Sequence, residues 1–210
     1  RAAIAVAVLA GYGALSALVA APDAASAGPL TFEGNLAGYI DRQFLPGKLI
    51  YGSFDPEGLL STVPAVVTAM LGMFTGEFVR RGDIRGGRKT LWMAAAAAAL
   101  LAAGLAFSGV LPVNKKLWSS TFVCVVGAYS LGMFALFYYL IDVRGWRRWT
   151  LFFRVVGLNS ITIYLAQRIV GFGRISDFFL GGIASKCPEA VAAVISSAGY
   201  VAVCWLFLYF

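Results

Sequence analysis

The segment from Ser119 to Ile141 reads SSTFVCVVGAYSLGMFALFYYLI and contains no charged side chain. A helix rises about 1.5 Å per residue, so about 20 apolar residues cross the hydrocarbon core of a bilayer. Lipid offers the backbone no hydrogen-bond partners, and a helix satisfies every backbone group within one segment. The segment therefore predicts a transmembrane helix.

Five other segments have a similar length and apolar character. They are residues 2–21, 58–79, 90–110, 151–170 and 190–210. The segment 151–170 differs from the rest because it carries more polar groups. Together the segments predict an all-α fold, a polytopic transmembrane helical bundle with about six spanning helices in a single region over residues 1–210.

The composition agrees with a membrane protein. Hydrophobic residues make up 60% of the chain and the mean hydropathy is +0.80. Charged residues make up 13%, whereas an ordinary soluble domain has about 25%. These values exclude a disordered chain, a nucleic-acid-binding module and an ordinary water-soluble enzyme. The net charge of the chain is +7. In a membrane protein such an excess of basic residues is typically found in cytoplasmic loops, so it does not indicate a nucleic-acid partner.

Basic side chains are concentrated in two short loops, residues 80–89 and 142–150. The first loop holds five basic residues among ten, and the second adds three arginines. By the order of the predicted helices both loops lie on one side of the membrane, and the positive-inside rule places them in the cytoplasm. We therefore expect an integral membrane protein with these two loops cytoplasmic.

Three connections lie on the opposite side, at residues 22–57, 111–118 and 171–189. The longest contains an amphipathic segment, residues 36–45, which we expect to form a short helix lying on the membrane surface. Long loops held by a rigid scaffold often carry function. We therefore expect any chemistry near this non-cytoplasmic face or in the bundle just beneath it.

The first candidate site is the acidic stretch directly before the second predicted span. Asp55 suits a helix N-cap, Pro56 suits the first helical position, and Glu57 is stabilised by the positive end of a helix dipole. Alternatively, the two carboxylates orient a catalytic base or bind sugar hydroxyls. The spacing leaves both interpretations open.

The second candidate lies directly before the fourth predicted span. Asn114 offers a donor and an acceptor, and Lys115 and Lys116 suit an anion such as a phosphate, a sugar carboxylate or a sulfate. The structural alternative is a capped helix entry, with Trp118 at the membrane interface and a serine at 119–120 as the cap. The sequence does not decide between them.

The fifth predicted span is unusual in its polar side chains. Asn159 lies in it. Four polar residues after Asn159 share one face of the predicted helix, because they lie at positions i, i+4, i+7 and i+8. These residues are Ser160, Tyr164, Gln167 and Arg168. Polar groups in lipid face protein or water, so they either hydrogen-bond to other helices or line a substrate cavity.

The fourth candidate site is at the cytoplasmic end of the fourth span. Asp142 and Arg144 suggest an ion pair at the membrane interface. Alternatively, the arginine holds a phosphate of an acyl-CoA or of an anionic lipid.

Several catalytic motifs are missing from the sequence. The chain has no histidine, so a Ser-His-Asp set is excluded, and neither a Walker loop nor a dinucleotide fingerprint is present. Cys124, Cys187 and Cys204 have no metal-ligand spacing. We therefore expect no metal site.

Short strings spread over most of the chain resemble the bacterial relatives of the heparan-α-glucosaminide N-acetyltransferase family. These strings are Gly34–Ala37, Tyr39–Asp41, Phe54–Thr62, Leu71–Gly72, Pro112–Ser119, Leu140–Gly145 and Gly157–Ile161. The resemblance implies a helical membrane acyltransferase that takes an acetyl group from cytosolic acetyl-CoA. It delivers this group across the membrane to the amine of a glucosamine-type acceptor.

The resemblance also implies partners and site residues. The Asp55–Gly58 motif, the Asn114–Trp118 motif, Asp142 and Asn159 match the family pattern. An amino sugar or glycan acceptor, membrane lipid and a possible homodimer are the expected partners, without nucleic acid. Acetyl-CoA is the expected cosubstrate, and the resemblance to bacterial relatives implies a bacterial inner membrane.

The family uses a histidine in its N-terminal half, which this chain does not contain. The chain begins with Arg1 rather than Met, and its last apolar run ends without a closing charge. We therefore expect a C-terminal portion of a longer enzyme, inactive by itself.

Two further classes of function fit the same composition. Six helices with polar groups at one interface are equally suited to a transporter or channel without covalent chemistry. A purely structural membrane subunit is the third possibility.

Overall fold

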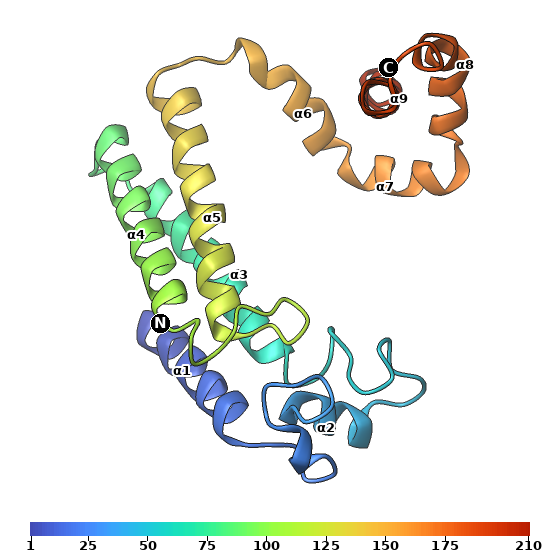
Figure 1. Ribbon diagram of the computed structural model, residues 1–210. Coiled ribbons are helices and arrows are strands. Elements are labelled where there is room, and N and C mark those ends of the chain that lie inside the picture. The colour runs from blue at the N-terminus through green and yellow to red at the C-terminus, as the bar shows by residue number, and fades with distance from the viewer. The chain divides into compact units, whose positions relative to one another are not determined.

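The computed structural model describes residues 1–210 apart from the side chain of Ala25. The chain divides into two compact units, Arg1–Gly145 and Trp146–Phe210, each described here by itself (Figure 1). Among the described residues the regular structure is helical, with one isolated antiparallel bridge between Ala20 and Asn35. The all-α prediction is confirmed. The prediction of a single region over the whole chain remains a prediction.

The first unit contains five α-helices. They are α1 (Ala2–Leu18), α2 (Leu36–Phe44), α3 (Thr62–Arg80), α4 (Gly86–Ala106) and α5 (Ser120–Tyr138), with a 3-10 turn at Ala25–Ala27 and a π-helical turn, Tyr139–Val143, that continues α5. Helices α3, α4 and the continuous segment Ser120–Val143 are long and apolar enough to cross a membrane. Helix α1 is apolar and has 17 residues, at the lower limit of about 17–25 for a span.

Close backbone approach and a few polar contacts hold these helices together. A Cβ atom on Gly104 of α4 would lie 2.8 Å from Val125 Cγ2 and 3.2 Å from the Thr121 carbonyl oxygen of α5. Helix α1 is joined to α5 because Ser120 Oγ donates a hydrogen bond to the Leu9 carbonyl at 2.7 Å. In lipid, where apolar burial adds little, such small-residue contacts and interhelical hydrogen bonds stabilise helix pairs.

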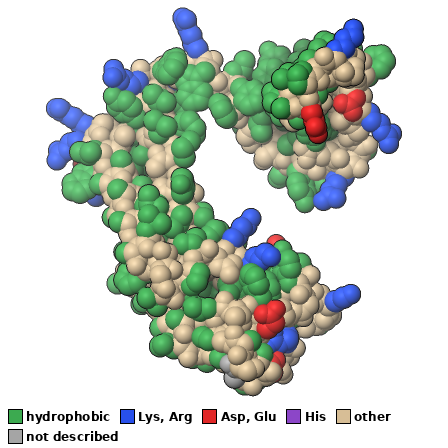
Figure 2. Space-filling view, viewed as in Figure 1, with side chains coloured by type: hydrophobic (Ala, Val, Ile, Leu, Met, Phe, Trp, Pro, Cys, Tyr) green, Lys and Arg blue, Asp and Glu red, His purple; other side chains and the backbone are tan. Residues whose placement is uncertain are grey.

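The loops of the first unit lie at two opposite ends of its helices. The Arg1 guanidinium pairs with the Glu77 carboxylate at 3.0 Å, which joins the start of α1 to the end of α3. A Cβ atom on Gly86 would lie 2.9 Å from Val143 Cγ2, so the start of α4 meets the end of the π-helical turn. We call this the basic end. The other end, where residues 22–61 and 111–119 lie, is the loop end. Lys and Arg gather toward the ends of this unit, with hydrophobic side chains along its helices (Figure 2).

The second unit begins with a 3-10 turn and contains four α-helices. These are α6 (Leu151–Leu158), α7 (Ser160–Ile169), α8 (Phe172–Ala184) and α9 (Glu189–Tyr209), after the turn at Arg148–Thr150. Helix α9 is long and apolar enough to span a membrane, so the chain is an integral membrane protein with four such helices, or five if α6 and α7 form one broken span.

The predicted helix over 151–170 is interrupted at Asn159. The segments Arg148–Leu158 and Ser160–Ile169 meet at an angle of 62°. Asn159 has φ −116° and ψ 24°, outside the helical region, and its side-chain amide donates to the Val155 carbonyl at 3.0 Å. A side chain that bonds to the carbonyl four residues earlier offers the backbone an alternative to the helix. The prediction of one continuous helix was therefore wrong.

The predicted connection at 171–189 was also wrong in part, since it contains the helix α8. Helix α8 buries Phe172, Ser176 and Ala184. A Cβ atom on Gly199 would lie 2.4 Å from Ser176 Oγ, so α8 and α9 pack in close contact. With 13 residues, α8 is too short to be recognised as a span.

The α4–α5 packing gives a direct test. Gly104→Val places side-chain atoms where Val125 and the Thr121 carbonyl already lie, and overpacking of this kind costs about 1–3 kcal/mol. We expect a lower thermal unfolding temperature in detergent. The matched control is Gly11→Val on α1, because a Cβ atom at Gly11 meets nothing within 4 Å. Equal unfolding temperatures for the two variants would contradict the close α4–α5 packing.

Candidate functional site

The loop end is organised around the carboxylate of Asp41, a residue of α2 with 0% of its surface exposed. Asp41 Oδ1 accepts the backbone N–H of Leu59 at 3.0 Å, and Oδ2 accepts the backbone N–H of Asp55 at 3.3 Å. A Cβ atom on Gly58 would lie 2.2 Å from Asp41 Oδ2, so glycine is required there. One carboxylate therefore attaches the acidic segment 55–59 to α2.

Burial of Asp41 has an electrostatic cost. Burial raises the pKa of Asp41 above its ordinary value, and the negative charge of Asp55 acts in the same direction. The two backbone hydrogen bonds and the charge of Arg42 oppose this rise without cancelling it. A carboxylate is retained because it offers two acceptor oxygens to two N–H groups.

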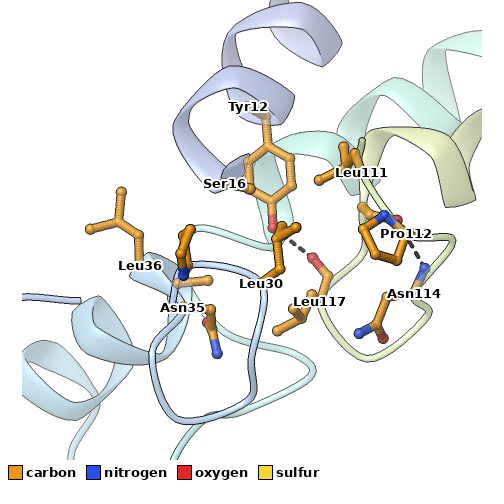
Figure 3. A pocket seen from close by; sticks show the side chains of 12 residues that line it. Tyr12, Ser16, Leu30, Asn35, Leu36, Leu111, Pro112, Asn114 and Leu117 are labelled. Carbon is orange, nitrogen blue, oxygen red and sulfur yellow. Dashed lines mark hydrogen bonds between the residues drawn. The ribbon is translucent and has the colours of Figure 1, made fainter. Parts of the chain in front are cut away.

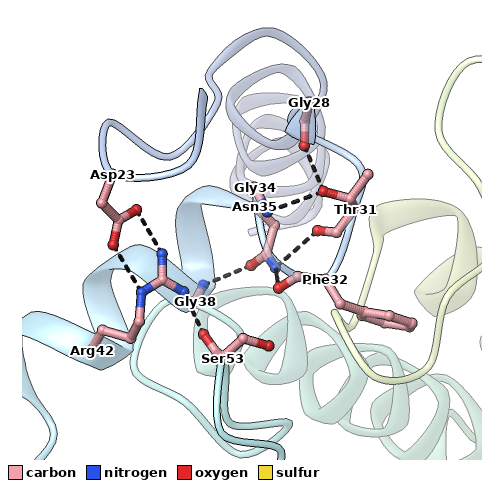
Figure 4. Close-up of polar contacts among 9 residues, drawn as sticks. All are labelled: Asp23, Gly28, Thr31, Phe32, Gly34, Asn35, Gly38, Arg42 and Ser53. Carbon is pink, nitrogen blue, oxygen red and sulfur yellow. Dashed lines mark hydrogen bonds and ion pairs between the residues drawn. The ribbon is translucent and has the colours of Figure 1, made fainter. Parts of the chain in front are cut away.

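Helix α2 is also fixed at its start and on its outer side (Figure 4). Asn35 caps the helix by accepting the Gly38 N–H at 2.6 Å, and its amide donates to the Phe32 carbonyl at 2.7 Å. Arg42 makes a bidentate pair with Asp23, at 2.9 and 2.7 Å, and also donates to the Ser53 carbonyl. The Arg42 hydrogen bond lowers the pKa of Asp23. These contacts hold the segments before and after α2 against it.

Three aromatic rings, the aromatic cluster of Phe32, Tyr51 and Phe54, meet beside the acidic segment. The rings of Phe32 and Tyr51 each stack on Phe54 with centroids 5.1 Å apart. Phe54 is buried, whereas Phe32 and Tyr51 are 37% and 50% exposed. The Lys116 ammonium lies 5.1 Å from the Phe32 centroid and 4.5 Å from the Tyr51 centroid. These cation–π contacts bring the loop before α5 to the acidic segment.

The loop 111–119 has a defined internal structure. Ser119 caps α5 by accepting the Phe122 N–H at 3.2 Å, and its hydroxyl also accepts the Asn114 N–H at 3.0 Å. Asn114 Oδ1 accepts the Lys116 N–H at 2.9 Å. Trp118 has a positive φ of 49°, and its indole N–H lies 3.4 Å from Thr68 Oγ1. The predicted serine cap of this helix is confirmed at position 119.

The predicted N-cap role of Asp55 was wrong. Helix α3 begins at Thr62, so Pro64 rather than Pro56 lies in its first turn. The Asp55 carboxylate instead accepts the N–H groups of Glu57 at 2.9 Å and Ile50 at 3.3 Å. The reason is tertiary: Asp41 holds the backbone of this segment in turns, which delays the start of the helix. Glu57 is exposed.

The predicted site residues therefore separate into three groups. Asp55, Glu57, Asn114, Lys115, Lys116 and Trp118 lie at the loop end of the first unit. Asp142 and Arg144 follow the far end of α5, at the basic end, and Asn159 belongs to the second unit. Both lysines of the loop end are exposed, and Lys116 contacts the aromatic cluster.

The predicted pair of Asp142 and Arg144 was wrong for the part of the chain that the structure describes. Arg144 instead donates through Nε to the Tyr139 hydroxyl at 2.9 Å, with its guanidinium 5.5 Å from the ring centroid. The Arg144 N–H also bonds to the Tyr139 carbonyl at 2.8 Å. This bond spans five residues, as in a π-helix, and it brings Arg144 and Tyr139 to the same side of the turn.

The polar residues of the fifth predicted span have different surroundings. The Asn159 amide lies 3.5 Å from the Leu208 carbonyl of α9, in addition to its bond to Val155. Ser160, Tyr164, Gln167 and Arg168 are exposed in the second unit. Helix–helix hydrogen bonding therefore accounts for Asn159, and the role of the α7 face remains a prediction.

A small cavity lies at the loop end between α1, the loop before α2 and the loop 111–119 (Figure 3). Its volume is about 20 Å³, room for about one water molecule. Tyr12 borders it and donates its hydroxyl to the Leu117 carbonyl at 2.6 Å. Asn35 and Asn114 also line it. The cavity is too small to hold a sugar. Among the described residues no three His, Cys, Asp or Glu side chains are placed to hold a metal ion.

Sequence reasoning did not select Asp41, Phe32 or Tyr51 as site residues. A signal for Asp41 was present, because it lies four residues after Ala37 on one face of a predicted amphipathic helix, and Ala37 is buried with it. Phe32 and Tyr51 gave no local signal. Their position depends on Phe54 and Lys116, which come from other parts of the chain.

Comparison with known proteins identifies two relatives of this chain. No protein-family model matches the chain. The fold and site define a polytopic, all-helical membrane protein that carries polar and aromatic side chains at the loop end of its first unit. Human heparan-alpha-glucosaminide N-acetyltransferase is 31% identical to it over 157 residues, 65% of this chain, and the mouse protein is 30% identical over 155 residues. The chain is therefore a distant relative of these transferases, and the match covers 23% and 24% of their lengths.

The raised pKa of Asp41 gives a pH dependence with a definite sign. The folded state binds the proton more tightly than the unfolded state, so stability falls as the pH rises from the unfolded pKa of about 3.9 through the higher folded value. Asp41→Asn removes this titration. It also places an amide donor against a backbone N–H, so the variant is less stable throughout.

The measurement is the free energy of unfolding of both proteins in detergent across this pH range. We expect the stability advantage of the wild type over Asp41→Asn to shrink as the pH rises. An advantage that grows with pH would mean that the folded-state pKa of Asp41 is lowered, contrary to its burial.

Proposed function

We propose that the chain is part of a membrane-bound acyltransferase that moves an acetyl group from acetyl-CoA to the amine of an amino sugar across the membrane. The observation that carries this proposal is the 31% identity over 157 residues to a protein named as an N-acetyltransferase of a glucosaminide. The loop end supports it, because exposed rings, a lysine and carboxylates lie together at the ends of the spanning helices.

The proposed reaction is a simple exchange at a thioester. The acceptor nitrogen attacks the acetyl carbonyl carbon, the carbon–sulfur bond breaks, and the thiol of CoA leaves. The amine loses one proton, which a base must accept. Asp41 and Asp55 both use their oxygens on backbone N–H groups. The chain contains no histidine, so we place the base outside these 210 residues.

Glu57 and Lys116 are the residues that we assign to the acceptor. The Glu57 carboxylate is exposed next to Asp55, where it binds an ammonium or sugar hydroxyl or orients the base. Lys116 lies over the aromatic cluster with its ammonium at the surface, suited to an acidic group of a glycan. The exposed faces of Phe32 and Tyr51 offer flat apolar surface to a sugar ring.

In this proposal the acyl donor, acetyl-CoA, approaches from the basic end. Arginines at the basic end, Arg144 among them, attract the phosphates of acetyl-CoA, and the positive-inside rule places that end in the cytoplasm. The acceptor then meets the acetyl group at the loop end. A bacterial inner membrane is the location that we propose, and a homodimer is the assembly.

One observation favours a second candidate, a transporter or channel segment. The 62° bend at Asn159 divides a span into two short helices, as in many transporters that bind substrate at broken helices. Solute uptake by reconstituted protein, independent of acetyl-CoA and abolished by Asn159→Leu, would favour this candidate.

The two adjacent lysines provide a matched test of the proposed acyltransferase. In the full-length protein, Lys116→Met keeps the apolar stem over the rings but removes the charge. We expect an increase of about tenfold in KM for an acidic glucosamine-containing acceptor, corresponding to about 1.4 kcal/mol, with little change in kcat. Lys115→Met, at an exposed position, is expected to leave KM within about twofold.

The measurement is transfer of labelled acetyl from acetyl-CoA in membranes that contain the folded protein. Equal KM values for the two variants would remove Lys116 from the acceptor site. Absence of transfer to any glucosamine-containing acceptor would contradict the proposed function itself.

A further inference from the structure

A large groove runs along the membrane-spanning part of the first unit, between α3, α4 and α5. Its volume is about 750 Å³, within the range of about 300–1,000 Å³ typical of small-molecule sites. Helices α4 and α5 pack along each other, whereas α3 diverges from α4. The groove therefore occupies the space that the diverging helix leaves open.

The walls of the groove are almost entirely apolar. Trp92, Phe134 and Leu100 contribute to them, as do Gly72 and Gly76, where a Cβ atom would meet nothing within 4 Å. These two glycines do not serve a helix–helix contact among the described residues. Their missing side chains widen the groove.

The few hydroxyl groups in the groove are largely engaged. Thr75 donates to the Leu71 carbonyl at 2.8 Å, and Thr68 Oγ1 lies 3.4 Å from the Trp118 indole nitrogen. A ligand with amide groups, such as the pantetheine arm of CoA, would leave those groups without partners in such a groove. A hydrocarbon chain has no such cost.

Two arginines lie at the mouth of the groove, at the basic end. Arg80 follows Gly76 by one helical turn on α3, and Arg88 precedes Trp92 by one turn on α4, so each shares a face with a lining residue. Both are exposed, and neither has an ion-pair or hydrogen-bond partner within the described chain.

A buried lysine joins the start of α4 to the end of α3, where these two arginines lie. The Lys89 ammonium donates to the Val79 carbonyl at 2.7 Å, although only 7% of Lys89 is exposed. The backbone at Arg88, beside Lys89, therefore lies within the reach of one lysine side chain of the backbone at Arg80, beside Val79. Lys89 also covers a carbonyl at the negative end of α3, which would otherwise repel an anion. Arg81 differs from these two because it pairs with Asp83 at 2.7 Å.

We propose that this groove binds an acyl chain of an anionic phospholipid, whose phosphate lies between Arg80 and Arg88. The apolar walls select the hydrocarbon chain, and the two free guanidinium groups select the negative headgroup. The site is separate from the loop end, and its test does not depend on acetyl transfer.

The test uses the full-length protein purified in detergent and native mass spectrometry of bound lipid. The probes are phosphatidylglycerol and phosphatidylcholine with identical acyl chains. We expect the wild type to retain one phosphatidylglycerol, with at least about a fivefold preference over phosphatidylcholine. Equal retention of the two lipids would overturn the proposal.

Two matched pairs of variants separate the chain site from the headgroup site. Gly76→Leu fills the groove and is expected to reduce phosphatidylglycerol retention at least about fivefold, whereas Gly11→Leu, at an equally open glycine of α1, is not. The double change Arg80→Gln with Arg88→Gln is expected to abolish the lipid preference. The double change Lys48→Gln with Lys115→Gln, which removes the same charge at the loop end, is expected to preserve it.

Thermal unfolding checks that each variant is folded. Gly76→Leu is not expected to unfold the protein, because leucine favours a helix more than glycine does. Full retention of phosphatidylglycerol by folded Gly76→Leu would overturn the proposal. Displacement of the lipid by acetyl-CoA would also overturn it, and would assign the groove to the acyl donor.

Discussion

A single buried carboxylate holds the loop end of this protein together. Asp41 accepts two backbone N–H groups from a segment that begins 14 residues later in the chain. A hydrogen bond to a charged group contributes about 1.5–3 kcal/mol, which offsets part of the cost of burying the charge. The approach is so close that Gly58 has no room for a side chain. The hydrogen bond from Arg42 to the Ser53 carbonyl holds the chain just before the acidic segment, and Asp41 holds the segment itself.

The remaining features of the loop end follow from that attachment. Once the segment 55–59 is fixed, Phe54 is buried and can stack with Phe32 and Tyr51, and these two rings hold Lys116. Two loops far apart in the sequence thus meet at the loop end. The spanning helices beneath it are held differently, by close contacts such as that of Gly104, because lipid supplies no hydrophobic driving force between helices.

Hydropathy predicted the location of the spanning helices well, because the transfer of a side chain into lipid is a local property of each residue. It predicted their ends less well. Helix α3 begins at Thr62 rather than residue 58 because Asp41, outside the helix, holds the preceding backbone in turns. Helix α8 was missed because it is short and its buried face exists only against α9.

The candidate site was also predictable in part, because the chemistry of a short motif is a local property of its residues. The motifs containing Asp55, Glu57, Asn114 and Lys116 were selected from their chemistry and do lie at one end of the first unit. The burial of Asp41 was not predicted, since it depends on a glycine 17 positions further along the chain. The partner of Arg144 was also predicted wrongly, because a π-helical turn changes which residues share a side.

Hydrogen exchange at the Asp55 and Leu59 amides tests the central role of Asp41 most directly. In the wild type both amides donate to the buried carboxylate, so we expect them to exchange slowly. In Gly58→Ala the added methyl group must displace that carboxylate, and exchange at both amides should be faster by about tenfold or more. Gly82→Ala, where the added Cβ atom meets nothing within 4 Å, is the control. Unchanged exchange at both amides in folded Gly58→Ala would contradict this account.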